Sequence, residues 1–267
     1  MAGHSGKFYK VRGALSSMTR VIAISSGKGG VGKTTTAINL AAAFNILEQN
    51  VLLIDGSLTT PDIGVYLGAP IIPIGVHDVL SGKKDAEDAV YEHHSGMKVM
   101  PASISLKELK NVRPENLAQI IREIRGENDV IIIDSAAGLG RETYSVLKAA
   151  DELIVVTSQD LPSVTNALKT AKIAEELGKS VLGVVVTRAT RNEDVSLKNI
   201  NSLFERPILA VIPEDNAVKA AVSAKDAVMH TAPKSKASKA YMKLAKNLLG
   251  IKTQNNWFEE FLSKFKM

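Results

Sequence analysis

A run of glycines broken by lysines near the start of the chain points most directly to chemistry. Residues 27–34 read GKGGVGKT and match the pattern G-x-x-x-x-G-K-[ST]. Glycines let the backbone wrap closely around phosphate oxygens, so consecutive N–H groups point at the anion. We expect Lys33 to meet the β- and γ-phosphates of a nucleotide and the Thr34 hydroxyl to ligate Mg²⁺.

Two aspartates are expected beside this loop, because each ends an apolar run that predicts a buried strand. Asp55 follows the run 51–54 and Asp134 follows the run 130–133. The carboxyl ends of parallel strands meet at one edge of the sheet, where ligands bind. An aspartate there is typical of Mg²⁺ coordination, although a helix cap is the alternative. The expected metal ligands are Thr34, Asp55 and Asp134.

Lys28 is a second lysine, which the phosphate-loop pattern does not require. The segment KGGVGKTT, residues 28–35, resembles the deviant Walker A motif of the MinD/ParA family of dimeric ATPases. The resemblance implies that Lys28 reaches across a dimer to the partner's nucleotide. A cation there can stabilise the charge that develops in the transition state. A solvated loop lysine is the alternative.

Three other segments extend the resemblance over about residues 20–250. The segment DSAAG at 134–138 is similar to the family's second switch, with Ala136 where proline is typical. Residues 181–188 and 212–215 resemble the segments that line the nucleotide base, and the missing Asn-Lys-x-Asp motif of GTPases favours ATP. The implied catalytic residues are Lys28, Lys33, Asp55 and Asp134. The implied nucleotide-binding residues are Gly27, Lys28, Gly29, Gly30, Val31, Gly32, Lys33, Thr34, Thr35, Gly138, Thr187, Arg188, Pro213, Glu214 and Asp215.

One position departs from the family's pattern. The first switch usually reads Asp-x-Asp, whereas here Ser57 stands two residues after Asp55. A serine hydroxyl can hold a water molecule but cannot act as a base near neutral pH. Asp62 is a candidate replacement, whose direction the sequence does not give. We therefore expect an ATP hydrolase that turns over slowly or not at all.

The elements that must position these residues alternate along the 267-residue chain. Helical patterns such as 34–47, 114–125 and 163–177 separate the β-branched runs. Repeated βα units predict an α/β fold with a doubly wound, mostly parallel sheet, which the resemblance makes a P-loop NTPase of the deviant Walker A type. The predicted strands are 21–25, 51–55, 97–102, 130–134, 153–157, 181–187 and 208–212.

Composition and charge exclude several classes of protein. The chain has no cysteine, which excludes disulfides, thiolate zinc sites, cysteine-held iron–sulfur clusters and a catalytic thiol. Aromatic residues make up only 4%, which argues against a base-stacking nucleic-acid module. No apolar run approaches the roughly 20 residues of a membrane span, and residues 1–17 lack the apolar core of a signal peptide. We expect a cytoplasmic protein.

The chain divides into four parts. Residues 1–19 form a basic extension, either native or an expression leader before Met18 as the natural start. Residues 20–250 form the ATPase domain, 251–256 a polar linker and 257–267 a separate tail. The basic ends favour contact with phosphate on lipid or nucleic acid, while a solvated lysine-rich surface is the alternative.

The tail is amphipathic when it is placed on a helix. Its aromatic and apolar face suits an interfacial membrane helix, and the lysines of residues 236–246 precede it as a cationic stripe. The pair resembles the membrane-targeting sequence of MinD proteins. A helix that packs on its own domain or on a partner protein is the alternative. The expected membrane residues are Trp257, Phe258, Phe261, Leu262 and Phe265.

Together these features predict a MinD-like ATPase with ATP and Mg²⁺ as cofactors. Its ATP-dependent homodimer would associate reversibly with the anionic inner face of the cell membrane and position the division site or a cell pole. An unidentified activator or cargo protein is the expected partner. One alternative is a ParA-like partition ATPase that binds DNA non-specifically, and the other is a nucleotide-dependent scaffold with weak or no hydrolysis.

Overall fold

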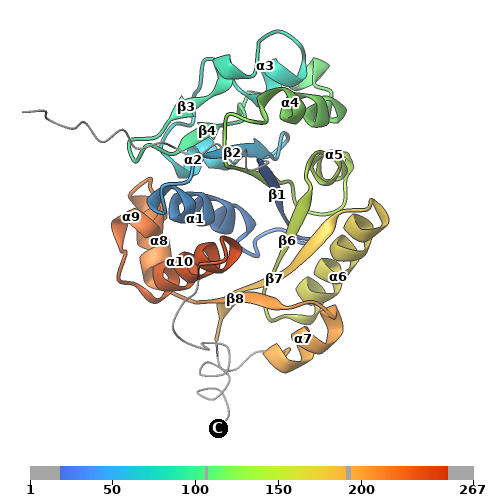
Figure 1. The fold of residues 1–267 in the computed structure, drawn as a ribbon, viewed down its shortest axis with the longest axis vertical. Helices are drawn as coiled ribbons and strands as arrows, with labels where there is room; N and C mark the ends of the chain where they lie inside the picture. Colours follow the sequence, from blue (N-terminus) through green and yellow to red (C-terminus); the bar gives the residue numbers. More distant parts are fainter. Residues whose placement is uncertain (1–18, 106–107, 191–193, 252–267) are drawn as a thin grey trace, which may run out of the picture.

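The computed structural model describes residues 19–105, 108–190 and 194–251. An eight-stranded sheet runs in the order β3-β4-β2-β5-β1-β6-β7-β8, and every neighbouring pair is parallel except β3–β4. The predicted doubly wound, mostly parallel α/β fold is confirmed (Figure 1). The strands are β1 (Arg20–Ser25), β2 (Val51–Gly56), β3 (Tyr91–Glu92), β4 (Lys98–Met100), β5 (Val130–Ser135), β6 (Glu152–Thr157), β7 (Ser180–Ala189) and β8 (Ile208–Pro213).

The seven predicted strands are confirmed, with ends displaced by at most three residues. The prediction missed β3, which pairs antiparallel with β4. Two residues are too few to produce a periodic pattern, so no sequence signal marks this strand. Although β3 is short, the turn that follows it carries two histidines.

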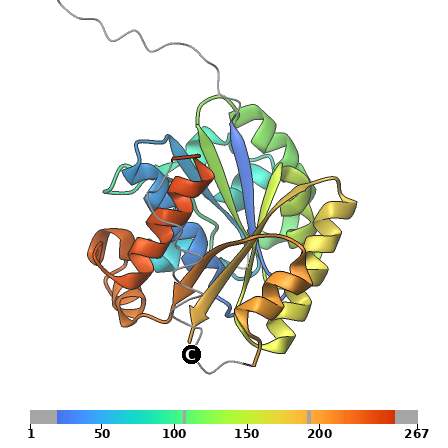
Figure 2. The same ribbon diagram turned by 60° about the horizontal axis from the view of Figure 1, so that its bottom comes forward.

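Helices cover both faces of the sheet (Figures 1 and 2). α1 and α8–α10 pack on one face of the sheet, and α4–α7 pack on the other. Both faces are apolar, since successive β1 residues point to opposite sides: Val21 and Ala23 lie in one core, and Ile22 and Ile24 lie in the other. The helices are α1 (Lys33–Ile46), α2 (Ile63–Tyr66), α3 (Val76–Leu80), α4 (Leu117–Ile124), α5 (Arg141–Ala149), α6 (Leu161–Glu176), α7 (Leu197–Phe204), α8 (Asn216–Ser223), α9 (Val228–Thr231) and α10 (Lys236–Leu248). Short 3-10 turns span Glu87–Ala89, Glu108–Asn111 and Pro114–Asn116.

The start of α6 shows how local sequence sets a helix end. Asp160 caps the helix by accepting a hydrogen bond from the Ser163 N–H at 3.0 Å. The helix therefore begins two residues before the predicted Ser163, and Gly178 follows its end with a φ of 70°. Asp160 also faces the phosphate loop, so this cap takes part in the site.

The first and last described elements are joined at the start of β1. Arg20 forms an ion pair with Glu152 at 2.9 Å and donates to the Leu248 carbonyl, at the end of α10, at 2.6 Å. Arg20 therefore belongs to the folded domain, and its charge is paired rather than free. The rest of the basic extension and the tail lie outside the described residues, so the boundaries at 19, 251 and 257 stay predictions.

Across residues 19–105, 108–190 and 194–251, none of the helices has the length and apolar character needed to cross a membrane.

Asn39 is the polar link that holds α9 against α1. Its side chain is fully buried, accepts from the Val228 N–H at 2.8 Å and donates to the Thr35 carbonyl at 2.8 Å. We expect Asn39→Ala to lower the free energy of unfolding by about 1–3 kcal/mol, because a buried N–H loses its acceptor. Urea unfolding measures this, with Asn247→Ala on the exposed face of α10 as the control. Equal losses in the two variants would contradict the assignment.

Candidate nucleotide site

The phosphate loop joins β1 to α1, and its glycines are required for two different reasons. Gly30 and Gly32 have φ values of 78° and 84°, a left-handed conformation that other residues adopt only with strain. At Gly27 a side chain would collide with the backbone carbonyl of Asn166, because α6 packs directly on the loop. Gly29 lies beside Ala137, so the loop also borders the predicted second switch.

Thr187 fastens the loop to the sheet. It is buried at the end of β7, with its hydroxyl 2.5 Å from the Val31 carbonyl and 3.2 Å from the Thr157 carbonyl. The sequence suggested Thr187 as a base contact, and its side chain does line the base pocket described below. Its hydroxyl, however, is committed to holding β6, β7 and the loop together.

Asp55 and Asp134 lie opposite each other on adjacent strands, as the sequence predicted. They are register partners of β2 and β5, and both are fully buried. Asp55 accepts hydrogen bonds from the backbone N–H groups of Ser57 and Ile63 at 3.1 and 3.2 Å. Neither carboxylate oxygen of Asp134 has a hydrogen-bond partner within the described part of the chain, and the Lys33 ammonium lies 3.6 Å away.

This pair of buried carboxylates is electrostatically costly without a cation. Burial raises the pKa of Asp55 well above its ordinary value and the Asp134 charge raises it further, while the two backbone hydrogen bonds lower it. Burial also raises the pKa of Asp134, and the Lys33 charge and the Thr34 hydroxyl only partly offset this. Unpartnered carboxylate oxygens beside a threonine hydroxyl are the all-oxygen set that Mg²⁺ prefers. The residues therefore fit the ion.

A pocket of about 150 Å³ opens beside the loop and gathers the residues that the sequence assigned to the base. The carboxyl ends of β7 and β8 supply one part of its wall, and α8 and α10 supply the rest. Lys219 and Tyr241 gave no signal in the sequence, because helix positions facing a pocket look like core or surface. The lining residues are Gly32, Thr35, Thr187, Arg188, Ile212, Pro213, Glu214, Asp215, Val218, Lys219, Val222 and Tyr241.

The polar residues of this wall are held in specific ways. Asp215 caps α8 by accepting from the Ala217 N–H at 2.9 Å, and its other oxygen accepts from the Ala237 N–H at 3.1 Å. The carboxylate therefore shapes the wall, which leaves backbone groups to face a base. Glu214 pairs with Lys219 at 3.2 Å. Arg188 is exposed in a left-handed conformation, φ 51°, which is uncommon outside glycine and recurs at functional sites.

The two lysines of the loop lie in different surroundings. Lys33 is 11% exposed and faces Asp134, whereas Lys28 is 46% exposed and pairs with Asp160 at 3.1 Å. Burial raises the pKa of Asp160, but hydrogen bonds from Ser158 and Ser163 and the contact with Lys28 outweigh it and hold the pKa below its ordinary value. Asp160 is therefore ionised at neutral pH and provides a counter-charge for Lys28.

The two switch segments are tied together by a residue that the sequence did not reveal. Glu142, in the first turn of α5, accepts from the Leu58 N–H at 3.0 Å and from the Thr59 hydroxyl. It links the loop after β2 to α5, the helix that follows the predicted second switch. Gly138, in that switch segment, has a φ of 80°. Because Glu142 is far along the chain from Leu58, no spacing pattern could predict the contact.

Ser57 and Asp62 differ in whether their side chains are available to position a water molecule. The Ser57 side chain is buried and donates to the Thr60 carbonyl at 2.8 Å, so its hydroxyl already has a partner. Asp62 is exposed, and its charge is close enough to raise the pKa of both Asp55 and Asp134. Asp62 therefore lies within electrostatic reach of the two buried carboxylates.

A loop that cradles phosphate above facing aspartates, on a sheet of this order, is the architecture of a P-loop ATPase. The family model described as AAA domain matches residues 19–165, which is more than half of the chain. A second model, described as 4Fe-4S iron sulfur cluster binding proteins, NifH/frxC family, matches residues 140–256. The chain has no cysteine to hold such a cluster, so this second match reflects the shared fold.

Similarity to individual proteins narrows the family to which this P-loop ATPase is assigned. An uncharacterized ATP-binding protein of Methanocaldococcus jannaschii is 35% identical over 93% of this chain and 96% of its own length. The antiactivator FleN of Pseudomonas aeruginosa is 31% identical over 86% of each chain. The structure of the septum site-determining protein MinD with Mg-ADP from Pyrococcus horikoshii superposes with a TM-score of 0.84 and 33% identity, covering 89% of this chain and 100% of that one.

The chain belongs to the MinD/ParA family of P-loop ATPases, as its phosphate loop indicated. ATP and Mg²⁺ are the cofactors of this family's site, and the buried oxygens of Asp134 and the Thr34 hydroxyl fit the ion.

Asp134 provides a test of the pH dependence of stability. Its pKa is raised in the folded state, so the folded protein holds its proton longer than the unfolded chain does. The nucleotide-free protein therefore loses stability as the pH rises from the ordinary value of 3.8 through the raised pKa. We expect Asp134→Asn to reduce this slope, by about 1.4 kcal/mol for each unit by which its pKa is raised, while Asp55, whose pKa burial also raises, keeps a slope of its own.

Urea unfolding from about pH 4 to about pH 8, without Mg²⁺, measures the slope. Asp85→Asn, at an exposed position, is the matched control. In the wild type Mg²⁺·ATP should raise the melting temperature, and in Asp134→Asn that rise should be lost. A variant whose slope matches the wild type would rule out the buried charge as its source.

Proposed function

We propose that this protein is an ATP-switched positioning ATPase. Two protomers, each with ATP and Mg²⁺, associate across their phosphate loops, and the dimer binds an anionic membrane through its C-terminal tails. Its output is the placement of a cell-division site or a cell pole, in line with the septum site-determining MinD proteins among its relatives. The observation that carries the proposal is the difference between the two loop lysines. Lys33 is largely buried and faces Asp134, whereas Lys28 is exposed and pairs with Asp160.

The exposed lysine supports an interface role. Lys33 is placed to hold phosphate within its own protomer, so Lys28 is not needed for that purpose. The Lys28–Asp160 pair lies at the surface, and exposed ion pairs contribute at most about 1 kcal/mol. Lys28 can therefore exchange Asp160 for the phosphates of a partner's nucleotide at little cost.

Slow hydrolysis follows from the residues around the γ-phosphate position. The loop N–H groups and Lys33 would hold the phosphates, and Thr34 with Asp134 would hold Mg²⁺, which supplies charge neutralisation when it is bound. Ser57 offers neither a base nor a free hydroxyl, since its Oγ–H is donated to Thr60. Asp62 is the remaining carboxylate within reach that could orient water. We propose that turnover waits for a partner protein that reorders this loop.

The membrane proposal depends on the tail, residues 257–267, which lie outside the described residues. α10 leads toward it with Tyr241 and Leu244 buried and with Lys236 and Lys239 exposed. The end of α10 is tied to Arg20 at the start of β1, the end of that strand opposite the phosphate loop. The described chain therefore ends α10 at the side of the sheet opposite the phosphate loop, which supports a membrane contact that leaves the nucleotide side free for dimerisation.

Energetics favour binding by dimers. Each large apolar side chain buried in the interface contributes about 1.5–3 kcal/mol, and each lysine near an anionic surface about 1 kcal/mol. Ordering each tail residue costs about 1–2 kcal/mol, so one tail binds marginally. Two tails on one dimer bind far better, because the second binding event is intramolecular. ATP thereby controls membrane binding through dimerisation.

Lys28→Ala tests the dimer. The variant should bind ATP as the wild type does, since Lys33 and the loop are intact. Its ATP-dependent dimer should weaken by more than about 100-fold, because the symmetric dimer loses two charge-assisted contacts of about 1.5–3 kcal/mol each. Light scattering with a non-hydrolysable ATP analogue measures this, with Lys84→Ala, an exposed lysine, as the control. A variant dimer as tight as the wild type would exclude the crossing role.

Deletion of Trp257–Met267 tests the membrane step. The truncated chain should fold and bind ATP, but it should no longer float with liposomes that contain anionic lipid. The full chain should float with ATP, much less with ADP, and more weakly as salt rises. If the truncated chain floats equally well, the tail does not bind membrane. If the full chain shifts DNA and never floats, a partition function replaces the one proposed.

A further inference from the structure

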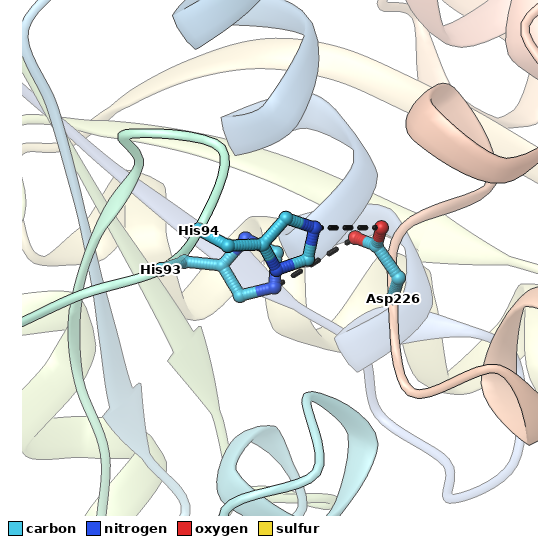
Figure 3. Close-up of side chains that lie close together, drawn as sticks. All are labelled: His93, His94 and Asp226. Carbon is cyan, nitrogen blue, oxygen red and sulfur yellow. Dashed lines mark ion pairs between the residues drawn. The ribbon is translucent and has the colours of Figure 1, made fainter.

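Three of the chain's five histidines converge on one carboxylate, away from the nucleotide site, and Figure 3 shows two of them, His93 and His94, beside Asp226. His93 and His94 lie in the turn between β3 and β4, and Asp226 lies between α8 and α9. The His94 Nε2 atom is 3.3 Å from Asp226 Oδ2, and the His93 Nε2 atom is 3.8 Å from Asp226 Oδ1. His230, on α9, places its Nδ1 atom 2.7 Å from Asp226 Oδ1.

The spacing of these donor atoms suits a metal ion. Zn²⁺ binds imidazole nitrogen and carboxylate oxygen at about 2.0–2.2 Å, so the donors of a tetrahedral site lie about 3.3 Å apart. The donor atoms of His93, His94 and Asp226 all lie within 4.8 Å of one another. Small side-chain rotations would bring the three to bonding distance, with a fourth position open to water.

The protonation states also suit a metal. Burial and the neighbouring His94 lower the pKa of His93, so its imidazole is neutral at pH 7. Burial raises the pKa of Asp226, but the hydrogen bonds from His230 and from the Ala227 N–H, with the nearby histidines, together hold the pKa below its ordinary value. Neutral imidazole and ionised carboxylate are the forms that bind transition metals.

The surroundings would orient the ligands. The His93 Nδ1 atom lies 2.9 Å from the Ser95 hydroxyl and accepts from the Ser95 backbone N–H at 3.4 Å, and these contacts hold the ring with its Nε2 atom toward Asp226. His230 donates from Nδ1 to Asp226, and its Nε2 atom is buried with no hydrogen-bond partner in the part of the chain that is described. The His93 side chain is 8% exposed and that of His94 70% exposed, so the cluster has a buried floor and an open entrance.

We propose that His93, His94 and Asp226 bind one divalent transition-metal ion of the Zn²⁺ class, with His230 orienting the carboxylate. The missing cysteines do not argue against this, because imidazole and carboxylate complete a zinc site by themselves. The ion would fasten the β3–β4 turn to the connection that follows α8. Since α8 carries Val218, Lys219 and Val222 of the base pocket, metal binding would stabilise that wall.

Calorimetric titration of the full chain with Zn²⁺ tests the site. Saturating Mg²⁺ and ADP keep Zn²⁺ away from Asp55 and Asp134. We expect one tight site for each chain, weakened more than about 100-fold in His94→Gln and about 10- to 100-fold in His230→Gln. His94 is exposed, so its substitution should leave folding intact. His4→Gln is the matched control and should bind as the wild type does.

Two further readouts test the coordination itself. Co²⁺ in place of Zn²⁺ should give the intense visible absorption of a tetrahedral site in the wild type and lose it in His94→Gln. Zn²⁺ should raise the melting temperature of the wild type but not of His94→Gln. Zn²⁺ binding by His94→Gln that equals the wild type, loss in His4→Gln or in Asp134→Asn instead, or the absence of stoichiometric binding would each overturn the proposal.

Discussion

The structure depends on keeping two carboxylates and one ammonium group buried together. Asp55 and Asp134 are fully buried on adjacent strands, and Lys33 alone supplies a nearby positive charge to Asp134 among the described ion pairs. Such a group is costly in a protein interior unless a further cation joins it. The site is thus assembled in advance for Mg²⁺ and phosphate, and the energy that the empty site costs is recovered when they bind.

The charges of the site are connected to the surface through short, polar links. Thr187 fixes the loop to β6 and β7, while Gly27 lets α6 approach its backbone. Asp160, which begins α6, holds Lys28 at the surface, and Glu142 joins the two switch segments. These links connect the phosphate loop to exposed groups at the start of α6, and the loop after β2 to α5.

The molecule separates its tasks in space. The nucleotide site occupies the carboxyl end of the sheet, and α10 ends beside the start of β1 at the other end. The histidine cluster lies at a third place, where the β3–β4 turn meets the connection after α8. Asp226 lies in the connection that follows α8, and α8 carries part of the wall of the pocket beside the loop, so the two places are close neighbours in the fold.

The sequence by itself determined the phosphate loop, the seven longer strands and the aspartates at the ends of β2 and β5. These features depend on contiguous residues, since glycine conformations, strand periods and strand ends are local properties of the chain. The tail at 257–267 also rests on a local pattern and stays a prediction. Only the tertiary structure revealed the partners of Lys28 and Leu58, the capping role of Asp215, and the meeting of His93 with Asp226. Those contacts join side chains far apart along the chain, and such contacts leave no period or spacing in the sequence because the fold alone brings them together.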